Sequence, residues 1–473
     1  MERVFFLVLL LPPAYFYFTH RLARTGLFSP FHSFWIAYFG MLIVQPLVEY
    51  EYFETLLGPA VILKTVLMGF VAGIGVVVGA AMPAASRYAK RLPRFVVEPI
   101  PRDFCWIGLT LIFIGVLAQL YVAFAVGGLD VLMGQARLSV TSDVSAYLYV
   151  LPDVAILGCL FLMIWRYRTG SLQSVVISTV LWFTCTVWYC YIGSRSRFMI
   201  LVVYLVVAKY CAGPGMVLGR MRRVPFMLVA ALFFLVPSMG LIGKYREYFY
   251  GGSVHFDVSN ADPIEMLVGG MEVYQAFDSD GQAKTATEYL MIGKVAELVP
   301  FSVAYDFGYM LLEIVTRAIP RQLWQDKIYP DSESWDRFHR VAETTKSINS
   351  AGFLAGPATP LPAKWFYMLG WPGLIIGGLY TGFLLRVIQE YVWRYDTLMG
   401  SVFSGIFFMV GFAEMNNPFT WQYVVIPFLL LPTILLVTIV SGIRRRQGNR
   451  NRTFRGEQIL HPKFAPSVRG TQI

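Results

Sequence analysis

Residues 59–82 read PAVILKTVLMGFVAGIGVVVGAAM. This run holds a single charged residue, Lys64, and it exceeds the roughly 20 residues that an α-helix needs to cross a bilayer. Its glycines at 73, 75 and 79 superficially resemble a dinucleotide-binding loop. No strand precedes them and their surroundings are apolar, so the spacing favours close packing against another helix. A second apolar run has similar spacing at Gly373, Gly377, Gly378 and Gly382.

The composition of the whole chain agrees with this run. Of 473 residues, 56% are apolar and only 14% are charged, whereas soluble proteins carry about a quarter charged residues. We therefore predict an all-α polytopic membrane protein with about 11 transmembrane helices, in a range of about 10 to 13. The predicted spans are residues 4–18, 32–48, 59–82, 104–127, 146–165, 174–193, 198–212, 226–243, 365–387, 398–413 and 422–442.

The chain carries no strong sign of a metal or cofactor. Its five cysteines lie within or at the ends of apolar runs, which argues against a disulfide framework and a thiolate metal site. No phosphate-binding P-loop is present, so nothing indicates transport driven by ATP. The acidic pairs Asp278/Asp280 and Glu49/Glu51 are too short to indicate a metal site. We expect neither a metal nor a cofactor.

Lys and Arg gather in every second loop. Since these residues concentrate on the cytoplasmic side of membrane proteins, the pattern predicts a periplasmic N-terminus and a cytoplasmic C-terminus. The basic set includes Arg21, Arg24, Arg87, Lys90, Arg91, Arg94, Arg166, Arg168, Arg220, Arg222, Arg223, Arg386, Arg394 and the tail from Arg444.

The predicted domain organisation follows from these spans. Residues 1–243 form a bundle of spans 1–8, residues 244–362 a large periplasmic loop, residues 363–443 spans 9–11, and residues 444–473 a basic cytoplasmic tail. Within the loop, residues 289–319 are apolar but interrupted by charges, which predicts interfacial or re-entrant helices. The tail is expected to contact acidic lipid headgroups.

Two arginines lie where the charge rule disfavours them. In WYCYIGSRSRFMIL (residues 188–201), Arg195 and Arg197 occupy a short turn on the predicted outer side. Arginine binds phosphate through a planar fork, so outer cations suit a diphosphate ligand. Asp153 is the best candidate for a buried partner of an arginine, while Lys64 and Lys209 could extend towards the bilayer surface. Further outer-side candidates are Lys244, Tyr245, Arg246, Arg317, Arg321, Trp324 and Lys327.

Three stretches are similar to one family, the Wzy-type O-antigen and exopolysaccharide repeat-unit polymerases. They are GSRSR at residues 193–197, GYMLLEIVTRAIPRQLWQDK at residues 308–327 and YMLGWPG at residues 367–373. The chain departs from the family pattern at Ala363-Lys364, where the family often has Gly-Glu, and in the residues after Trp324 and Lys327. A role for an acidic residue at the third stretch therefore does not carry over.

The resemblance implies a glycosyltransferase with a C-type-like membrane architecture in the bacterial inner membrane. It would polymerise oligosaccharide units carried on undecaprenyl diphosphate at the periplasmic face. Arg195, Arg197 and Arg246 would then stabilise the departing diphosphate, with Arg321 closing from the loop. The expected partners are these lipid-linked oligosaccharides and the bilayer, with a flippase and a chain-length regulator as family expectations and no nucleic acid. The base candidates are His339, Glu272, Asp306 and Glu313, of which His339 has the most suitable ordinary pKa.

The sequence leaves two alternative functions open. The same architecture fits an O-antigen ligase or another glycosyltransferase that uses polyprenyl-phosphate sugars. A lipid-linked oligosaccharide flippase or other transporter is the non-enzymatic alternative. The concentration of polar residues in one outer loop disfavours it.

Overall fold

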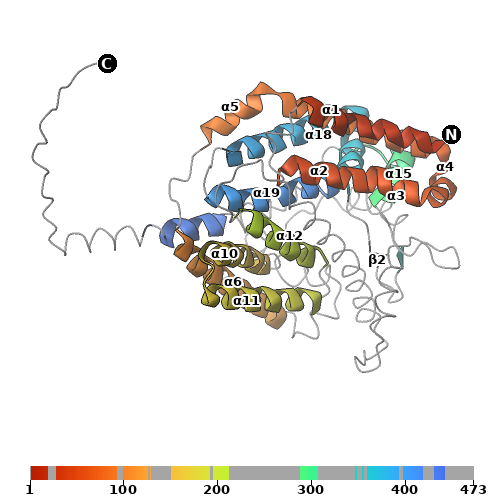
Figure 1. The fold of residues 1–473 in the computed structure, drawn as a ribbon. Helices are drawn as coiled ribbons and strands as arrows, with labels where there is room; N and C mark the ends of the chain where they lie inside the picture. Colours follow the sequence, from red (N-terminus) through yellow and green to blue (C-terminus); the bar gives the residue numbers. More distant parts are fainter. Residues whose placement is uncertain are drawn as a thin grey trace, which may run out of the picture.

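The computed structural model describes residues 2–19, 28–92, 100–125, 128, 151–191, 195–211, 288–306, 347–348, 354–355, 359–393, 398–418, 431–440 and 442. Its helices are η1 (Glu2–Leu10), α1 (Leu11–Thr19), α2 (Pro30–Phe39), η3 (Gly40–Val44), α3 (Gln45–Val48), α4 (Tyr50–Ala81), α5 (Pro83–Arg91), α6 (Pro101–Ala125), η4 (Leu151–Asp153), α10 (Val154–Thr169), α11 (Leu172–Tyr191), α12 (Arg195–Cys211), α15 (Glu288–Leu298), α18 (Leu361–Trp393) and α19 (Leu398–Asn416) (Figure 1).

The chain is an all-α membrane protein. Among the described residues, five helices are long and apolar enough to span a bilayer: Pro30–Val48, Tyr50–Ala81, Pro101–Ala125, Leu172–Cys190 and Leu361–Val392. They coincide with the spans predicted at 32–48, 59–82, 104–127, 174–193 and 365–387.

The remaining predicted spans are not among these five helices. Shorter or partly described helices occupy most of them: Arg3–Thr19, α10, α12, α19 and Leu431–Val440. The span at 226–243 lies outside the described residues. The total of eleven spans and the domain boundaries therefore stay predictions.

Helices α4 and α18 pack so closely that their backbones touch. A Cβ atom at Gly75 would lie 2.9 Å from the Cα of Gly378, and one at Gly382 would lie 2.8 Å from the amide nitrogen of Ala80. The paired positions increase together, so the two helices run parallel. The glycine spacing thus serves helix packing, as the sequence predicts. Small residues allow the close approach that drives helix association in lipid.

The same two helices are kinked near their starts. Gly58 adopts φ 73° and ψ 158°, and Gly370 adopts φ 64° and ψ −142°. Both values of φ lie in the region that favours glycine. Proline follows closely in each helix, at Pro59 and Pro372, and weakens the helical hydrogen bonding there. Each helix is therefore divided into a short first segment and a long straight segment.

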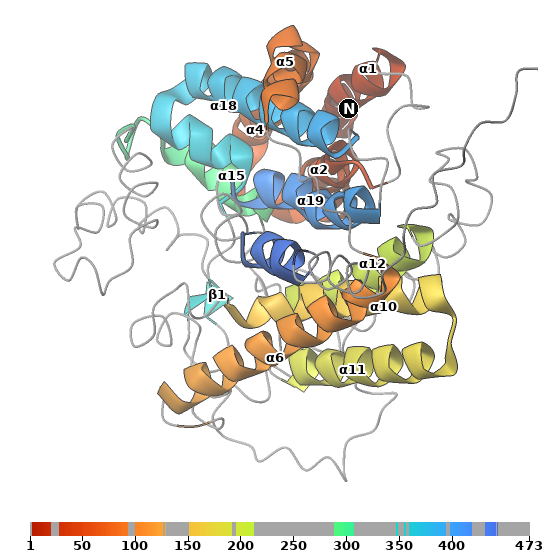
Figure 2. The same cartoon turned by 90° about the vertical axis from the view of Figure 1, so that its left-hand side faces the viewer.

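A second group of helices also packs closely at glycine residues. In α6 and α10, a Cβ atom at Gly158 would lie 2.9 Å from the amide nitrogen of Ile112, and one at Gly115 would lie 2.7 Å from that of Ala155. Here the paired positions run in opposite directions, so the helices are antiparallel. The parallel direction of α4 and α18 and the antiparallel direction of α6 and α10 both agree with the span directions that the distribution of Lys and Arg predicts. Figure 2 shows α6, α10 and α11 below the group that contains α4, α18 and α19.

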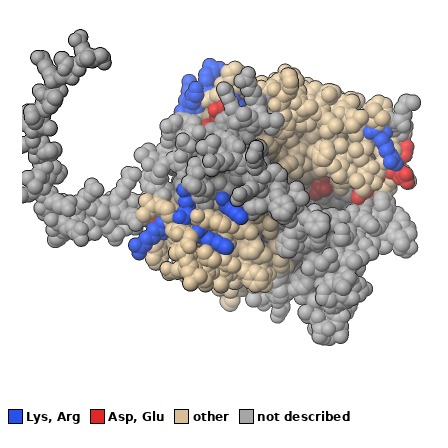
Figure 3. Space-filling view, in the orientation of Figure 1, with Lys and Arg blue, Asp and Glu red and all other residues tan. Residues whose placement is uncertain are grey.

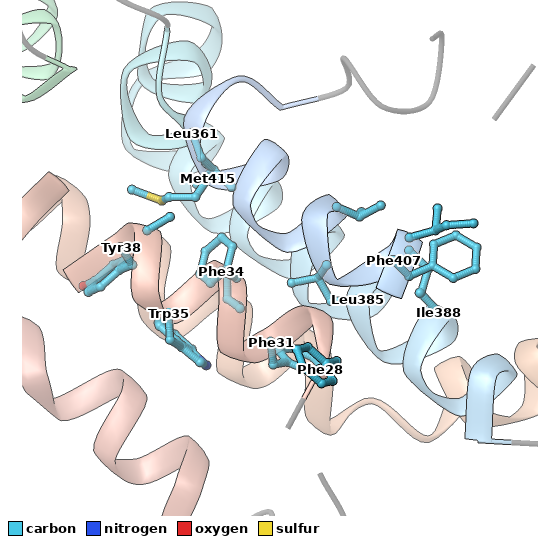
Figure 4. Close-up of a cluster of buried hydrophobic side chains, with 14 of the residues drawn as sticks. Phe28, Phe31, Phe34, Trp35, Tyr38, Leu361, Leu385, Ile388, Phe407 and Met415 are labelled. Carbon is cyan, nitrogen blue, oxygen red and sulfur yellow. The ribbon is translucent and has the colours of Figure 1, made fainter. Parts of the chain in front are cut away.

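An aromatic core joins α2 to α18 and α19. Phe31 and Phe34 are fully buried, and the ring of Phe28, just before α2, lies 5.6 Å from that of Phe408. Figure 4 shows these rings facing side chains from α18 and α19, with Met415 nearer Phe34 than Phe28. Because α19 also contacts α12, this core connects the two groups of helices.

Helix α15 is fixed to the bundle by Lys64. The Nζ atom of Lys64 donates to the carbonyl oxygens of Ala296 at 2.5 Å and Val299 at 3.4 Å, and it lies 5.0 Å from the Phe366 ring centroid. These carbonyls close the C-terminal end of α15, where the helix offers unpaired acceptors and negative partial charge. The sequence allowed Lys64 to extend towards the bilayer surface; in the structure its half-buried side chain joins α4, α15 and α18. A two-residue antiparallel pair, β1 (Ser347–Ile348) with β2 (Leu354–Ala355), is also described in the loop.

The two ends of the bundle differ in their balance of charge. Figure 3 shows mainly Lys and Arg on the left, over α5 and near the end of α10, and most of the acidic atoms on the right, near the start of α4, together with a further group of basic atoms. Glu51 and Glu54 lie near the start of α4, whereas Arg87 lies on α5 and Arg166 and Arg168 lie in the last turn of α10. The residues that the sequence divides between two sides thus lie at opposite ends of the molecule.

We expect Gly382→Leu to destabilise the protein by about 1–3 kcal/mol or more, because the new side chain meets backbone that cannot move aside. The measurement is thermal unfolding of the purified protein in detergent. Gly40→Leu is the matched control, since no atom lies within 4 Å of its added Cβ. Equal melting temperatures for the two variants would contradict the glycine contact between α4 and α18.

Candidate functional site

Arg197 forms an ion pair with Asp153. Its Nε lies 2.5 Å from Oδ1 of Asp153, and the two side chains are 9% and 22% exposed. Arg197 lies in the first turn of α12, and Asp153 is the residue before α10. The interpretation of Asp153 as the buried partner of an arginine is confirmed.

Tyr189 completes this cluster from α11. The Arg197 guanidinium carbon lies 5.7 Å from the centroid of the Tyr189 ring, within the range of a cation–π contact. The Tyr189 hydroxyl donates to the carbonyl oxygen of Pro152 at 3.0 Å. One tyrosine therefore connects the end of α11 to the residue before Asp153. We call Pro152, Asp153, Tyr189 and Arg197 the arginine cluster.

The backbone adds positive charge to this cluster. Helices α10 and α12 both begin here, and the N-terminal end of a helix carries a partial positive charge. The Asp153 carboxylate makes no capping hydrogen bond to α10 and instead contacts Arg197. Together, one guanidinium and two helix ends face one described carboxylate. Such a combination suits an anion, because helix N-termini and arginine are common phosphate-binding elements.

The structure places only part of the predicted site. Arg195 begins α12, two residues before Arg197. The other predicted cations, aromatic residues and the histidine lie outside the described residues: Lys244, Tyr245, Arg246, Arg317, Arg321, Trp324, Lys327 and His339. Their approach to Arg197 therefore stays a prediction.

Of the acceptor-base candidates, only Asp306 is described. Its backbone N–H donates to the carbonyl oxygen of Tyr367 at 3.2 Å, so it lies beside the first segment of α18. Glu272 and Glu313 lie outside the described residues. Nothing in the arrangement brings Asp306 into the arginine cluster.

Sequence reasoning missed two features of the site region. Tyr189 was not singled out, because its contact with Arg197 depends on how α11 and α12 pack together and has no local signal in the sequence. Lys364 was noted only as a departure from a motif. In the structure it is buried, and its Nζ donates to the carbonyl oxygen of Pro418 at 3.3 Å, which links α18 to the residues after α19. Glu414 of α19 is also fully buried.

The comparisons with known proteins give no family. No protein-family model, curated protein or solved structure matches the chain. Among the described residues, no group of three or more His, Cys, Asp or Glu side chains could hold a metal ion. The function therefore has to be argued from the arginine cluster and the sequence.

Removing one member of the ion pair should be costly. We expect Asp153→Ala to destabilise the protein by about 3 kcal/mol, because a buried guanidinium loses its partner. The double variant Asp153→Asn with Arg197→Gln should recover much of this loss, since neither charge remains. Thermal unfolding in detergent measures both.

An exposed ion pair supplies the control for this test. Arg3 and Glu51 lie 3.4 Å apart with side chains 57% and 90% exposed, so Glu51→Gln should change stability by less than about 1 kcal/mol. A double variant at Asp153 and Arg197 that is no more stable than Asp153→Ala would show that the two side chains are not coupled.

Glu288, in the first turn of α15, should make stability depend on pH. Burial raises the pKa of its carboxyl group, with partial compensation from a hydrogen bond to the backbone. The folded chain then binds this proton more tightly than the unfolded chain. The free energy of unfolding therefore falls as pH rises from about 4.3, the ordinary glutamate pKa, through the raised value.

Glu288→Gln removes this titration. We expect the variant to melt at a higher temperature than the parent at pH 7 and at the same temperature at pH 4. Glu297→Gln is the control, because Glu297 pairs with Lys294 at 2.7 Å and its replacement should give no gain. The same gain for Glu288→Gln at both pH values would be incompatible with this explanation.

Proposed function

We propose that this protein polymerises oligosaccharide repeat units carried on undecaprenyl diphosphate at the periplasmic face of the bacterial inner membrane. The observation that carries the proposal is the buried Arg197, held by Asp153 and Tyr189 where α10 and α12 begin. A second support is the similarity of the GSRSR stretch and the two later stretches to repeat-unit polymerases.

The chemistry matches the available residues. The acceptor hydroxyl oxygen attacks the anomeric carbon of the donor sugar, and the bond from that carbon to the diphosphate oxygen breaks. The hydroxyl proton passes to a base, and undecaprenyl diphosphate leaves with the bonding electrons. Negative charge therefore develops on the diphosphate, where fixed cations stabilise the transition state. Because the leaving group is already activated, the step needs no nucleotide.

The ion pair with Asp153 also fixes the orientation of the Arg197 side chain. An arginine side chain loses much conformational freedom when it binds a ligand, and an ion pair formed beforehand reduces that loss. The ion pair with Asp153 is made at Nε of Arg197. In this proposal Arg195 and Arg246 share the diphosphate with Arg197, and Arg321 approaches from the outer loop.

The decisive experiment compares lipid-linked glycans with and without the protein. Loss of the gene should cause lipid-linked single repeat units to accumulate on the periplasmic leaflet. Full-length chains that are not transferred to lipid A core would instead identify a ligase. Substrate trapped on the cytoplasmic leaflet would identify a flippase and contradict the proposal.

Two substitutions test the arginines within that assay. Arg197→Lys keeps the positive charge beside Asp153 but loses the planar fork, so we expect normal insertion and chain extension reduced at least about tenfold. Arg195→Ala should reduce extension without disturbing the ion pair. Arg3→Gln, which changes an exposed cation at the end of the bundle opposite α5, is the control. Normal polymer length in both Arg197→Lys and Arg195→Ala would refute the role.

A further inference from the structure

Helix α5 is fixed to the bundle by one narrow face. It begins after Met82, whose extended backbone (φ −63°, ψ 121°) ends α4 and lets Pro83 start a new helix. Ala85 and Ala89 are fully buried and pack with Val387 of α18. Small side chains at a spacing of four residues let α5 lie close to α18.

The opposite face of α5 is basic and exposed. At 100° per residue, Arg87, Lys90 and Arg91 lie within about 60° of the direction opposite Ala85 and Ala89. The ring of Tyr88 is 55% exposed on the same helix. Figure 3 shows this face as a concentration of blue at the upper left.

The nearby acid does not neutralise this face. The Glu390 carboxylate lies 2.6 Å from a guanidinium nitrogen of Arg386 and accepts a hydrogen bond from Ser86 at 3.2 Å. Among the described residues, no carboxylate forms an ion pair with Arg87 or Arg91. The charges of Arg87 and Arg91 are thus held on a fixed helix and turned away from the protein.

The position of α5 along the bundle matches the level of lipid headgroups. After the kink at Gly370, residues 371–393 of α18 extend for about 35 Å at 1.5 Å per residue. The hydrocarbon core is only about 30 Å thick, so one end of this segment reaches the headgroup region. Arg386 and Glu390, the charged residues near its end, mark that level, and α5 packs beside them.

We propose that the face formed by Arg87, Lys90 and Arg91 binds the phosphate groups of anionic phospholipids. Cationic residues next to a membrane span attract acidic headgroups, and arginine adds directional hydrogen bonds to phosphate. Tyr88 is suited to the same interface, where aromatic side chains with a polar group concentrate. This inference is independent of the reaction proposed above.

The test uses the purified full-length protein in detergent with phosphatidylglycerol and phosphatidylcholine added in equal amounts. Bound lipid is identified by native mass spectrometry. We expect the parent protein to retain phosphatidylglycerol preferentially. The triple variant Arg87→Gln, Lys90→Gln, Arg91→Gln should lose this preference by about fivefold for each cation removed.

A second triple variant, Arg444→Gln, Arg445→Gln, Arg446→Gln, removes the same charge from the tail. Because the tail is also expected to contact acidic headgroups, this variant should lose part of the preference, but less than the α5 variant loses. A loss as large as that of the α5 variant, or no loss in the α5 variant, would overturn the proposal. A double variant Arg87→Lys, Arg91→Lys checks folding and should retain phosphatidylglycerol because both charges remain.

Salt gives an independent measurement on the parent protein. Exposed charges are screened within about 10 Å at 0.1 M salt, so the preference should fall as sodium chloride is raised. A preference that does not change with salt would also overturn the assignment to this basic face.

Discussion

The close contact between α4 and α18 is the constraint on which the described fold depends. Helices in lipid gain nothing from burying apolar surface against one another, so they associate through close packing. Gly75 and Gly378 supply that packing by letting two backbones touch. Helix α15 contacts both members of this pair, and α5 contacts α18 near the opposite end. A bulky residue between α4 and α18 would therefore disturb the supports of both α15 and α5.

The arginine cluster is constrained by the cost of unpaired charge, whereas the contact between α4 and α18 is constrained by close packing. Charge within a membrane protein is expensive unless it is paired, and a guanidinium that loses its partner destabilises the fold. Arg197, Asp153 and Tyr189 come from three helices, so their contacts also fix how α10, α11 and α12 meet. The same pairing that makes the charge tolerable holds it in one orientation. This is the property that the proposed diphosphate site requires.

Lys64 shows how one cation can connect α4 to the end of α15. Its contacts with Ala296 and Val299 satisfy carbonyl groups that the end of α15 would otherwise leave unpaired. Lys364 has a comparable position, since it donates to Pro418 from the start of α18. Both lysines use backbone oxygens beyond their own helices. The two lysines at this end of the structure thus act as connections between elements, while the cations of α5 at the opposite end face outward.

The sequence by itself determined the membrane class, five of the spans and the helix-packing role of the glycines. Each follows from local composition and spacing, which require no knowledge of distant residues. It also indicated Asp153 as a partner for an arginine, because an acid near an apolar span needs one. Only the tertiary structure decided that this arginine is Arg197, that Tyr189 joins it and that Lys64 turns inward to α15. These choices depend on which helices become neighbours, and a long side chain binds whatever acceptor the packing brings within reach.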